Sequence, residues 1–162
     1  MRSAFSGLVA VICVALASIG VARSNPSMLG TFRLEHPTFV HPHNFATEHV
    51  VIQVSEARPG RWTLALNNAQ NILDAVGMQK AQIVVVAYGP GLRMLLSNTP
   101  DAKRIQSLDA EGVEFDACHN TMEAMARKFG RMPELVPQAV IVPAGVLRIM
   151  QLETHGFAYL KP

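Results

Sequence analysis

The chain has 162 residues, of which 49% are hydrophobic and 16% are charged. This composition suits one globular domain with a substantial core and excludes an intrinsically disordered chain. The formal net charge is only +2 and the basic residues are scattered along the chain, which argues against a nucleic-acid-binding protein.

Residues 1–22 have the pattern of a secretory signal peptide. Arg2 supplies a positive charge, residues 8–16 form an unbroken apolar run, and Gly20 and Ala22 place small residues at a cleavage site. The apolar run is shorter than the roughly 20 residues that a membrane-spanning helix needs. We therefore expect export and cleavage near Ala22, with a periplasmic location in a Gram-negative source and no membrane association after cleavage. An uncleaved anchor is the alternative.

Residues 23–48 predict an extended arm, because they contain three prolines and show neither the helical nor the strand period. We expect the arm to lie over the domain or over a neighbouring subunit. The arm also carries His36, His41 and His43, which together suggest a metal site. Their spacing is loose and the prolines keep the segment extended, so we expect no metal there.

From residue 49 onward, strand and helix patterns alternate. Short apolar or β-branched runs predict strands at residues 50–54, 83–87, 113–117, 139–142 and 157–160. Apolar residues three or four positions apart predict long helices that begin near residues 62, 101, 120 and 145, and a short helix at 92–96. Strands that alternate with helices through short connections predict one α/β domain over residues 49–162, with a mostly parallel sheet.

The helical pattern also predicts which side chains face the core. In the helix that begins near residue 120, we expect the inward residues to be Met122, Met125, Ala126 and Phe129. In the last helix, we expect them to be Val146, Ile149, Met150 and Leu152.

Functional sites of open parallel sheets lie beyond the carboxyl ends of the strands. Two segments with unusual chemistry follow predicted strands: residues 88–91 (YGPG) after the second strand and residues 118–121 (CHNT) after the third. If these strands are neighbours, the glycine turn and the thiol share one pocket. Backbone N–H groups of the turn would then face an anion near the thiol; a plain tight turn is the alternative.

Cys118 is the single thiol of the chain once a signal peptide containing Cys13 is removed. It precedes the first turn of a helix, where unpaired N–H groups and the helix dipole stabilise an anionic thiolate. His119 adds positive charge when it is protonated. We expect Cys118 to present an open sulfur at the mouth of the site. The alternatives are a buried cysteine that packs as a small apolar residue, and a soft copper ion held by Cys118, His119 and Met122.

Five segments, taken together and in order, resemble the DsrE/DsrF-like sulfur-relay family, and most closely its exported single-domain members. They are residues 66–71 (LNNAQN), 86–91 (VAYGPG), 112–122 (GVEFDACHNTM), 142–146 (VPAGV) and 156–159 (GFAY). The resemblance covers residues 50–162. It implies a three-layer α/β/α domain around a five-stranded, largely parallel sheet, with an architecture related to flavodoxin. It also implies assembly as a trimer or hexamer.

In cytoplasmic sulfur-transfer members of that family, one cysteine after a central strand accepts sulfur as a persulfide and passes it on. Cys118 matches that cysteine, and residues 88–91 match the turn beside it. The export signal is a departure from the cytoplasmic members. The resemblance thus implies a periplasmic sulfur carrier rather than a turnover enzyme. Its partners would be sulfur donor and acceptor proteins or small sulfur compounds.

The site predicted in this way consists of two residues for sulfur chemistry, Cys118 and His119, and five that contact the substrate. The five are Tyr88, Gly89, Gly91, Asn120 and Thr121. We expect neither a metal nor a cofactor. The alternative function is that of a non-catalytic oligomeric binding or assembly module, in which Cys118 is inert.

Overall fold

The computed structural model describes residues 24–162, so the predicted signal peptide lies outside the described residues. The strands are β1 (Glu48–Val54), β2 (Ala81–Ala87), β3 (Glu114–Cys118), β4 (Ala139–Val142) and β5 (Ala158–Leu160). The α-helices are α1 (Pro59–Val76), α2 (Ala102–Ala110), α3 (His119–Phe129) and α4 (Gly145–Thr154), and two 3₁₀ segments are η1 (Met78–Lys80) and η2 (Gly89–Leu95). Within the described range, no helix has the length and hydrophobicity to cross a membrane.

The five strands form one sheet in the order β4-β3-β2-β1-β5, and all neighbouring strands pair in parallel. The predicted α/β fold is therefore confirmed, and the sheet is wholly parallel. Every residue of β2 is buried, as its continuous apolar sequence indicates for a strand covered on both faces.

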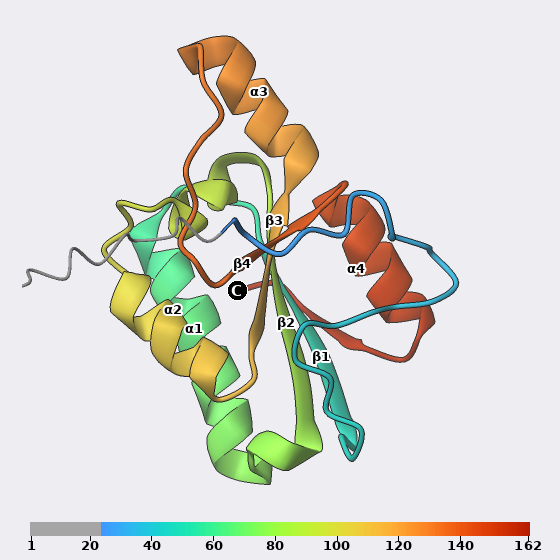
Figure 1. Ribbon diagram of the computed structural model, residues 1–162. Helices are drawn as coiled ribbons and strands as arrows, with labels where there is room; N and C mark the ends of the chain where they lie inside the picture. The colour runs from blue at the N-terminus through green and yellow to red at the C-terminus, as the bar shows by residue number, and fades with distance from the viewer. Residues whose placement is uncertain (1–23) are drawn as a thin grey trace, which may run out of the picture.

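One face of the sheet is covered by two helices, and the other by one helix and the arm. Helices α1 and α2 pack on one face, while α4 and the arm lie on the other (Figure 1). On the first face Leu66 and Ile105 belong to the main apolar core. On the second face Ile149 and Leu152 pack against Val51 and Val84. The three-layer arrangement follows from strands that are apolar on both sides.

The arm, residues 24–47, lies over the domain of its own chain. The backbone N–H of Met28 donates to the carbonyl of Ile141 at 2.8 Å, and the N–H of Ile141 donates to the carbonyl of Pro26 at 2.8 Å. A short bridge thereby adds the arm to the outer edge of β4. Further along the arm, the Phe39 ring stacks on Phe157, with ring centroids 5.8 Å apart.

The first long helix begins at Pro59, three residues before the predicted start, because proline suits the first turn of a helix. The helix after β3 begins at His119, one residue earlier than predicted. The carboxyl ends of α1 and α3 lie at glycines, as the sequence predicts. Gly77 follows α1 with a φ of 86°, and Gly130 follows α3 in the left-handed conformation with a φ of 79°.

The predicted inward faces of two helices are partly wrong. Helix α3 projects away from the body of the molecule (Figure 1), with Met122 as its one buried residue, and Phe129 is 58% exposed. In α4, Ile149 and Leu152 are buried as predicted, but Val146 and Met150 are 55% and 51% exposed. The buried stripe of α4 instead includes two polar residues, Arg148 and Gln151.

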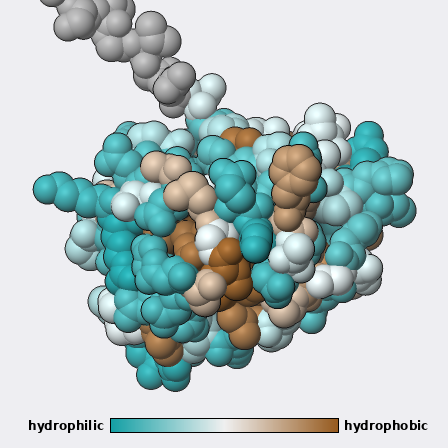
Figure 2. Space-filling view, turned by 90° about the horizontal axis from the view of Figure 1, so that it is seen from below, coloured by the Kyte–Doolittle hydropathy of each residue, from teal (hydrophilic) through white to brown (hydrophobic). Residues whose placement is uncertain are grey.

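The end of the molecule opposite α3 has a mostly hydrophilic surface, with apolar side chains gathered near the middle of that face (Figure 2). The amino ends of the strands lie toward this end, and their carboxyl ends lie toward α3 (Figure 1). The two segments predicted to carry chemistry both follow carboxyl ends, so they lie at the α3 end of the molecule.

Candidate functional site

Cys118 lies at the predicted junction between a strand and a helix. It is the last residue of β3 and the N-cap residue of α3, with extended backbone angles of φ −70° and ψ 113°. It is paired in register with Val142 of β4, and the residue before it, Ala117, is paired with Ala87 of β2. The sulfur-bearing residue therefore lies between the carboxyl ends of two neighbouring strands.

The connections that follow β3 and β4 leave the sheet toward opposite faces. Met122 of α3 belongs to the core on the α1 side, whereas Ile149 of α4 belongs to the core on the other side. Neighbouring strands with such connections leave a crevice beyond their carboxyl ends, where α/β proteins bind ligands. The two chain segments meet there, because the N–H of Asn120 donates to the carbonyl of Pro143 at 3.3 Å.

The glycine turn after β2 joins the start of α3, as the sequence predicts. The N–H of Gly89 donates to the Thr121 hydroxyl oxygen at 2.9 Å. Because that N–H is already paired within the chain, it is not free for an anion. Gly91 is buried, and a Cβ atom there would lie 2.2 Å from the carbonyl oxygen of Val54. A glycine at position 91 is thus required by close packing against the end of β1.

Tyr88 forms one side of the environment of Cys118. Its side chain lies so close to Gly145 at the start of α4 that a Cβ atom on Gly145 would be 2.9 Å from the Tyr88 Cβ. Partial burial raises the pKa of the Tyr88 phenol, and the nearby Tyr159 and Cys118 add to the rise because each disfavours a second negative charge. The phenol is therefore neutral at physiological pH.

The expectation of an open sulfur is wrong for the chain taken alone. Cys118 is 5% exposed, whereas His119 and Thr121 are half-buried and Asn120 is exposed. The thiol lies near Tyr88, whose side chain packs against Gly145 at the start of α4. The structure therefore brings the glycine turn and the start of α3 together but leaves the thiol buried.

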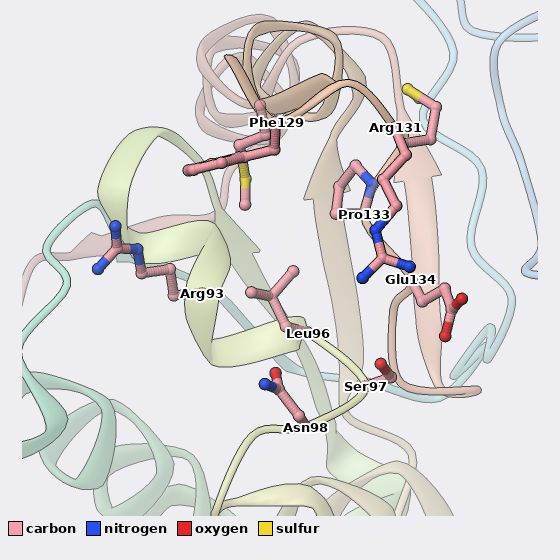
Figure 3. Close-up of a pocket in the computed structure, with 10 residues that line it drawn as sticks. Arg93, Leu96, Ser97, Asn98, Phe129, Arg131, Pro133 and Glu134 are labelled. Carbon is pink, nitrogen blue, oxygen red and sulfur yellow. The ribbon is translucent and has the colours of Figure 1, made fainter. Parts of the chain in front are cut away.

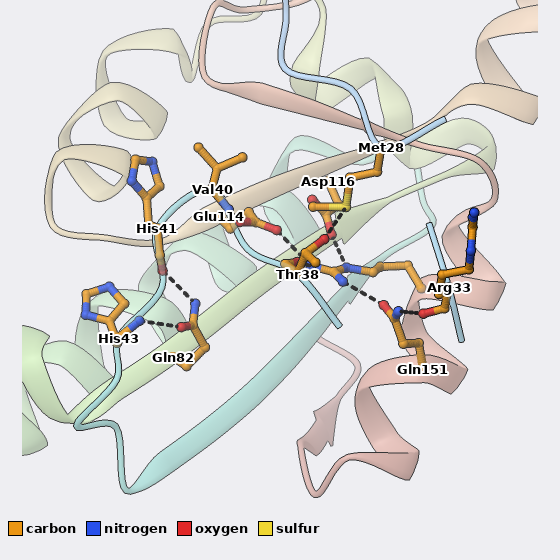
Figure 4. Close-up of polar contacts among 11 residues, drawn as sticks. Met28, Arg33, Thr38, Val40, His41, His43, Gln82, Glu114, Asp116 and Gln151 are labelled. Atoms are coloured by element: carbon orange, nitrogen blue, oxygen red, sulfur yellow. Dashed lines mark hydrogen bonds and ion pairs between the residues drawn. The ribbon is translucent and has the colours of Figure 1, made fainter. Parts of the chain in front are cut away.

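A buried charged cluster, which the sequence interpretation missed, lies on the same side of β3. Glu114, Asp116 and Cys118 alternate along the strand and so share the face that α4 covers. The Arg148 guanidinium of α4 donates to Glu114 at 2.8 Å and to Asp116 at 2.7 Å, and to the Gln151 side chain at 2.6 Å (Figure 4). The period-two acidic residues of β3, within a strand otherwise apolar, are the sequence signal that marks such a cluster.

The cluster contains two carboxyl groups and one guanidinium. Burial raises the pKa of Asp116 well above its usual range, and the neighbouring Glu114 raises it further, while Arg148 acts in the opposite direction. The Asp116 Oδ1 atom has no hydrogen-bond partner among the described residues. A proton on Asp116 leaves the cluster electrically neutral, which is the form that a buried site tolerates best.

Side chains of the sheet and of α4 bind the backbone of the arm. Glu114 accepts the N–H of Val40, Arg148 donates to the carbonyl of Thr38 at 2.9 Å, and Gln82 binds both His41 and His43 through their main chain (Figure 4). The buried polar groups on this face are therefore bound partly by Arg148 of α4 and partly by the backbone of the arm.

Two histidines of the arm make polar contacts with the domain. His41 contacts the Asp109 carboxylate at 3.0 Å, and the His43 ring lies 3.3 Å from the carbonyl of Gly112. Across residues 24–162, no three His, Cys, Asp or Glu side chains converge in a way that could hold a metal ion. These histidines instead contribute to fixing the arm.

No protein-family model matches the chain, and no curated protein matches it. Among solved structures, the chain is similar to MTH1491 from Methanobacterium thermoautotrophicum, a protein of unknown function, with a TM-score of 0.64 and 29% sequence identity. The alignment covers 71% of this chain and 99% of that chain.

Proposed function

We propose that this protein carries sulfane sulfur as a persulfide on Cys118, as an exported relative of the DsrE/DsrF-like proteins that it resembles. The position of the thiol is the observation that carries the proposal. Cys118 caps the start of α3 at the carboxyl edge of the sheet, where the connections of β3 and β4 diverge. At the start of a helix, the dipole favours an anionic sulfur, although the Cys118 side chain makes no capping hydrogen bond to α3 in this structure.

The proposed step is a thiol exchange that needs no metal or redox cofactor. The Cys118 thiolate attacks the outer sulfur of a donor persulfide or polysulfide, one S–S bond forms as another breaks, and the donor leaves as a thiolate. Delivery to an acceptor thiolate is the same reaction in reverse, with Cys118 as the leaving group. His119 would support the anionic sulfur when its ring is protonated, and the exposed Asn120 would contact the incoming donor.

A donor must reach a thiol that is 5% exposed. Helix α3 begins directly after Cys118 and has Met122 as its one buried residue, so a movement of its first turn would also move the thiol relative to Tyr88 and the start of α4. A small movement of the first turn would uncover Cys118, and the closed position would shield a persulfide from oxidants. Shielding of this kind suits the export to the periplasm that residues 1–22 predict.

The second candidate is a non-catalytic module that assembles into a trimer or hexamer and keeps Cys118 as an inert core residue. Two observations favour it: the burial of the thiol, and the exposed apolar side chains Phe129, Val146 and Met150 on two helices. Light scattering on the purified protein measures the assembly that both candidates share.

Intact-mass measurement separates the two functions. The protein, expressed from the full-length sequence and purified, is incubated with polysulfide, with glutathione persulfide and with thiosulfate. We expect a gain of one sulfur atom that dithiothreitol removes, that Cys118→Ser abolishes and that Cys13→Ser leaves unchanged. The same spectrum shows whether residues 1–22 have been removed. If no donor adds sulfur to Cys118, the carrier function is wrong and the inert module remains.

A further inference from the structure

A groove lies at the far end of α3 from Cys118. Its volume is about 420 Å³, and it is bounded by the end of η2 on one side and by α3 and the segment after it on the other (Figure 3). The apolar part of its lining consists of Leu96, Met125, Phe129, Met132 and Pro133. Arg93 and Arg131 lie on opposite sides of the groove (Figure 3).

The apolar side chains of this groove are unusually open to solvent. Phe129 is 58% exposed and Met132 is 45% exposed, on the part of the molecule that projects furthest from the sheet. Aromatic, methionine and arginine side chains are the types enriched at the centres of protein interfaces. Methionine adapts its shape to different partners because its side chain is flexible. The composition of the groove is thus that of a protein-binding surface.

The charge around the groove is predominantly positive. Neither Arg93 nor Arg131 forms an ion pair with a carboxylate of residues 24–162. Arg127 and Lys128 in the last turn of α3 are also exposed, and the lining of the groove contains one acidic residue, Glu134. Guanidinium groups that lack an ion-pair partner and lie beside an apolar surface favour the binding of a segment that carries both carboxylates and apolar side chains.

We propose that this groove docks an acidic segment of a partner protein, with apolar side chains of the segment against Phe129 and Met132 and its carboxylates on Arg93 and Arg131. The groove lies away from the thiol, since the 11 residues of α3 span roughly 16 Å at about 1.5 Å per residue. The docking therefore does not depend on sulfur chemistry at Cys118, and it holds or fails separately from the proposed function.

Selection from a displayed library of random peptides tests both the site and the chemistry of its occupant. The immobilised target is the purified protein, and the Phe129→Ala variant serves for counter-selection. We expect the enriched peptides to combine Asp or Glu with Leu, Phe or Trp. In fluorescence polarisation, Phe129→Ala and Arg131→Glu should each weaken their binding at least tenfold, and higher salt should weaken it further.

Matched surface variants provide the controls. Phe45→Ala removes another exposed phenylalanine, and Lys103→Glu reverses another exposed charge, so both should leave peptide binding unchanged. Peptides without an acidic bias, or peptides that bind the Phe129→Ala variant equally well, would overturn the proposal. Self-association that is lost in Phe129→Ala would assign the groove to a second copy of the chain and would overturn it too. Binding of dodecanoate but of no peptide would overturn it in favour of a small anionic amphiphile.

Discussion

The residue that governs the buried face of the sheet is Arg148. Its guanidinium is fully buried and faces two carboxyl groups, so the protonation of Asp116 decides whether the cluster is neutral. An acid whose pKa is raised on folding stabilises the native state fully below its unfolded pKa, near 3.9 for Asp, and this stabilisation is lost as pH rises through the raised pKa. The cluster therefore makes the protein less stable toward alkaline pH.

The variant Asp116→Asn should remove that pH dependence, because an amide keeps the uncharged form of the side chain at every pH. We expect the wild-type free energy of unfolding to fall by up to about 1.4 kcal/mol for each pH unit over the titration of Asp116. The variant should show a flatter profile in urea unfolding between about pH 5 and pH 8. Asp74→Asn, an exposed change on α1, is the matched control. Parallel profiles for the wild type and Asp116→Asn would refute the assignment of a proton to Asp116.

Among the helices, α3 has the lightest attachment to the domain. It begins directly after Cys118 and ends at the groove that Phe129 and Arg131 line. It contributes one buried side chain, Met122. An element with few buried apolar contacts opens locally at low free-energy cost. The accessibility of Cys118 should therefore follow the stability of α3 rather than that of the whole domain.

We expect Met122→Ala to speed the alkylation of Cys118 by iodoacetamide. Truncating a buried methionine costs about 2–5 kcal/mol. Part of this lost free energy weakens the packing of α3 on the domain. Each 1.4 kcal/mol lost in this way raises the population of molecules with α3 detached about tenfold. A rate increase of at least tenfold, followed by mass spectrometry, is the expected outcome. Met125→Ala, a half-buried position on the same helix, should change the rate much less. Equal rates in all three proteins would show that α3 does not control access to the thiol.

The comparison between sequence and structure is most instructive at the elements around the thiol. The apolar run of β2 and the junction at Cys118 are local, and the proximity of the glycine turn to the start of α3 follows from parallel pairing of neighbouring strands, so the sequence was sufficient to predict them. The bond between the Gly89 N–H and Thr121 was not predicted. The inward face of α4 was not predictable from hydrophobicity, because Arg148 is buried through ion pairs with a distant strand. The burial of Cys118 likewise depends on Tyr88 and Gly145, which lie far from it in the sequence.

At the scale of the whole molecule, the arm takes the place of a helix in the second layer. Polar side chains of the sheet and of α4 would be difficult to satisfy in an apolar layer. The arm supplies backbone partners for Glu114, Arg148 and Gln151 and for both bonds of Gln82. The stability of this layer therefore depends on an extended segment far from its partners in the sequence.

Gln82→Met should loosen the arm, because the apolar side chain keeps the volume of Gln82 but gives no hydrogen bond to His41 or His43. Each lost hydrogen bond is worth about 0.5–1.5 kcal/mol. We expect faster tryptic cleavage after Arg33, an exposed residue of the arm. Gln79→Met, an exposed change in η1, should leave the rate unchanged. Identical cleavage rates for Gln82→Met and the wild type would mean that other contacts hold the arm.

The way in which the arm is bound has a consequence for its evolution. The domain recognises amide and carbonyl groups of Thr38, Val40, His41 and His43, which every amino acid except proline provides in full. The side chains of Thr38 and Val40 are exposed, and their one recorded side-chain bond is a weak one from the Thr38 hydroxyl to the Met28 sulfur. Those two positions are therefore free to diverge among descendants of this protein while the shape of the segment persists, and proline at position 40 or 43 is the replacement that selection should remove.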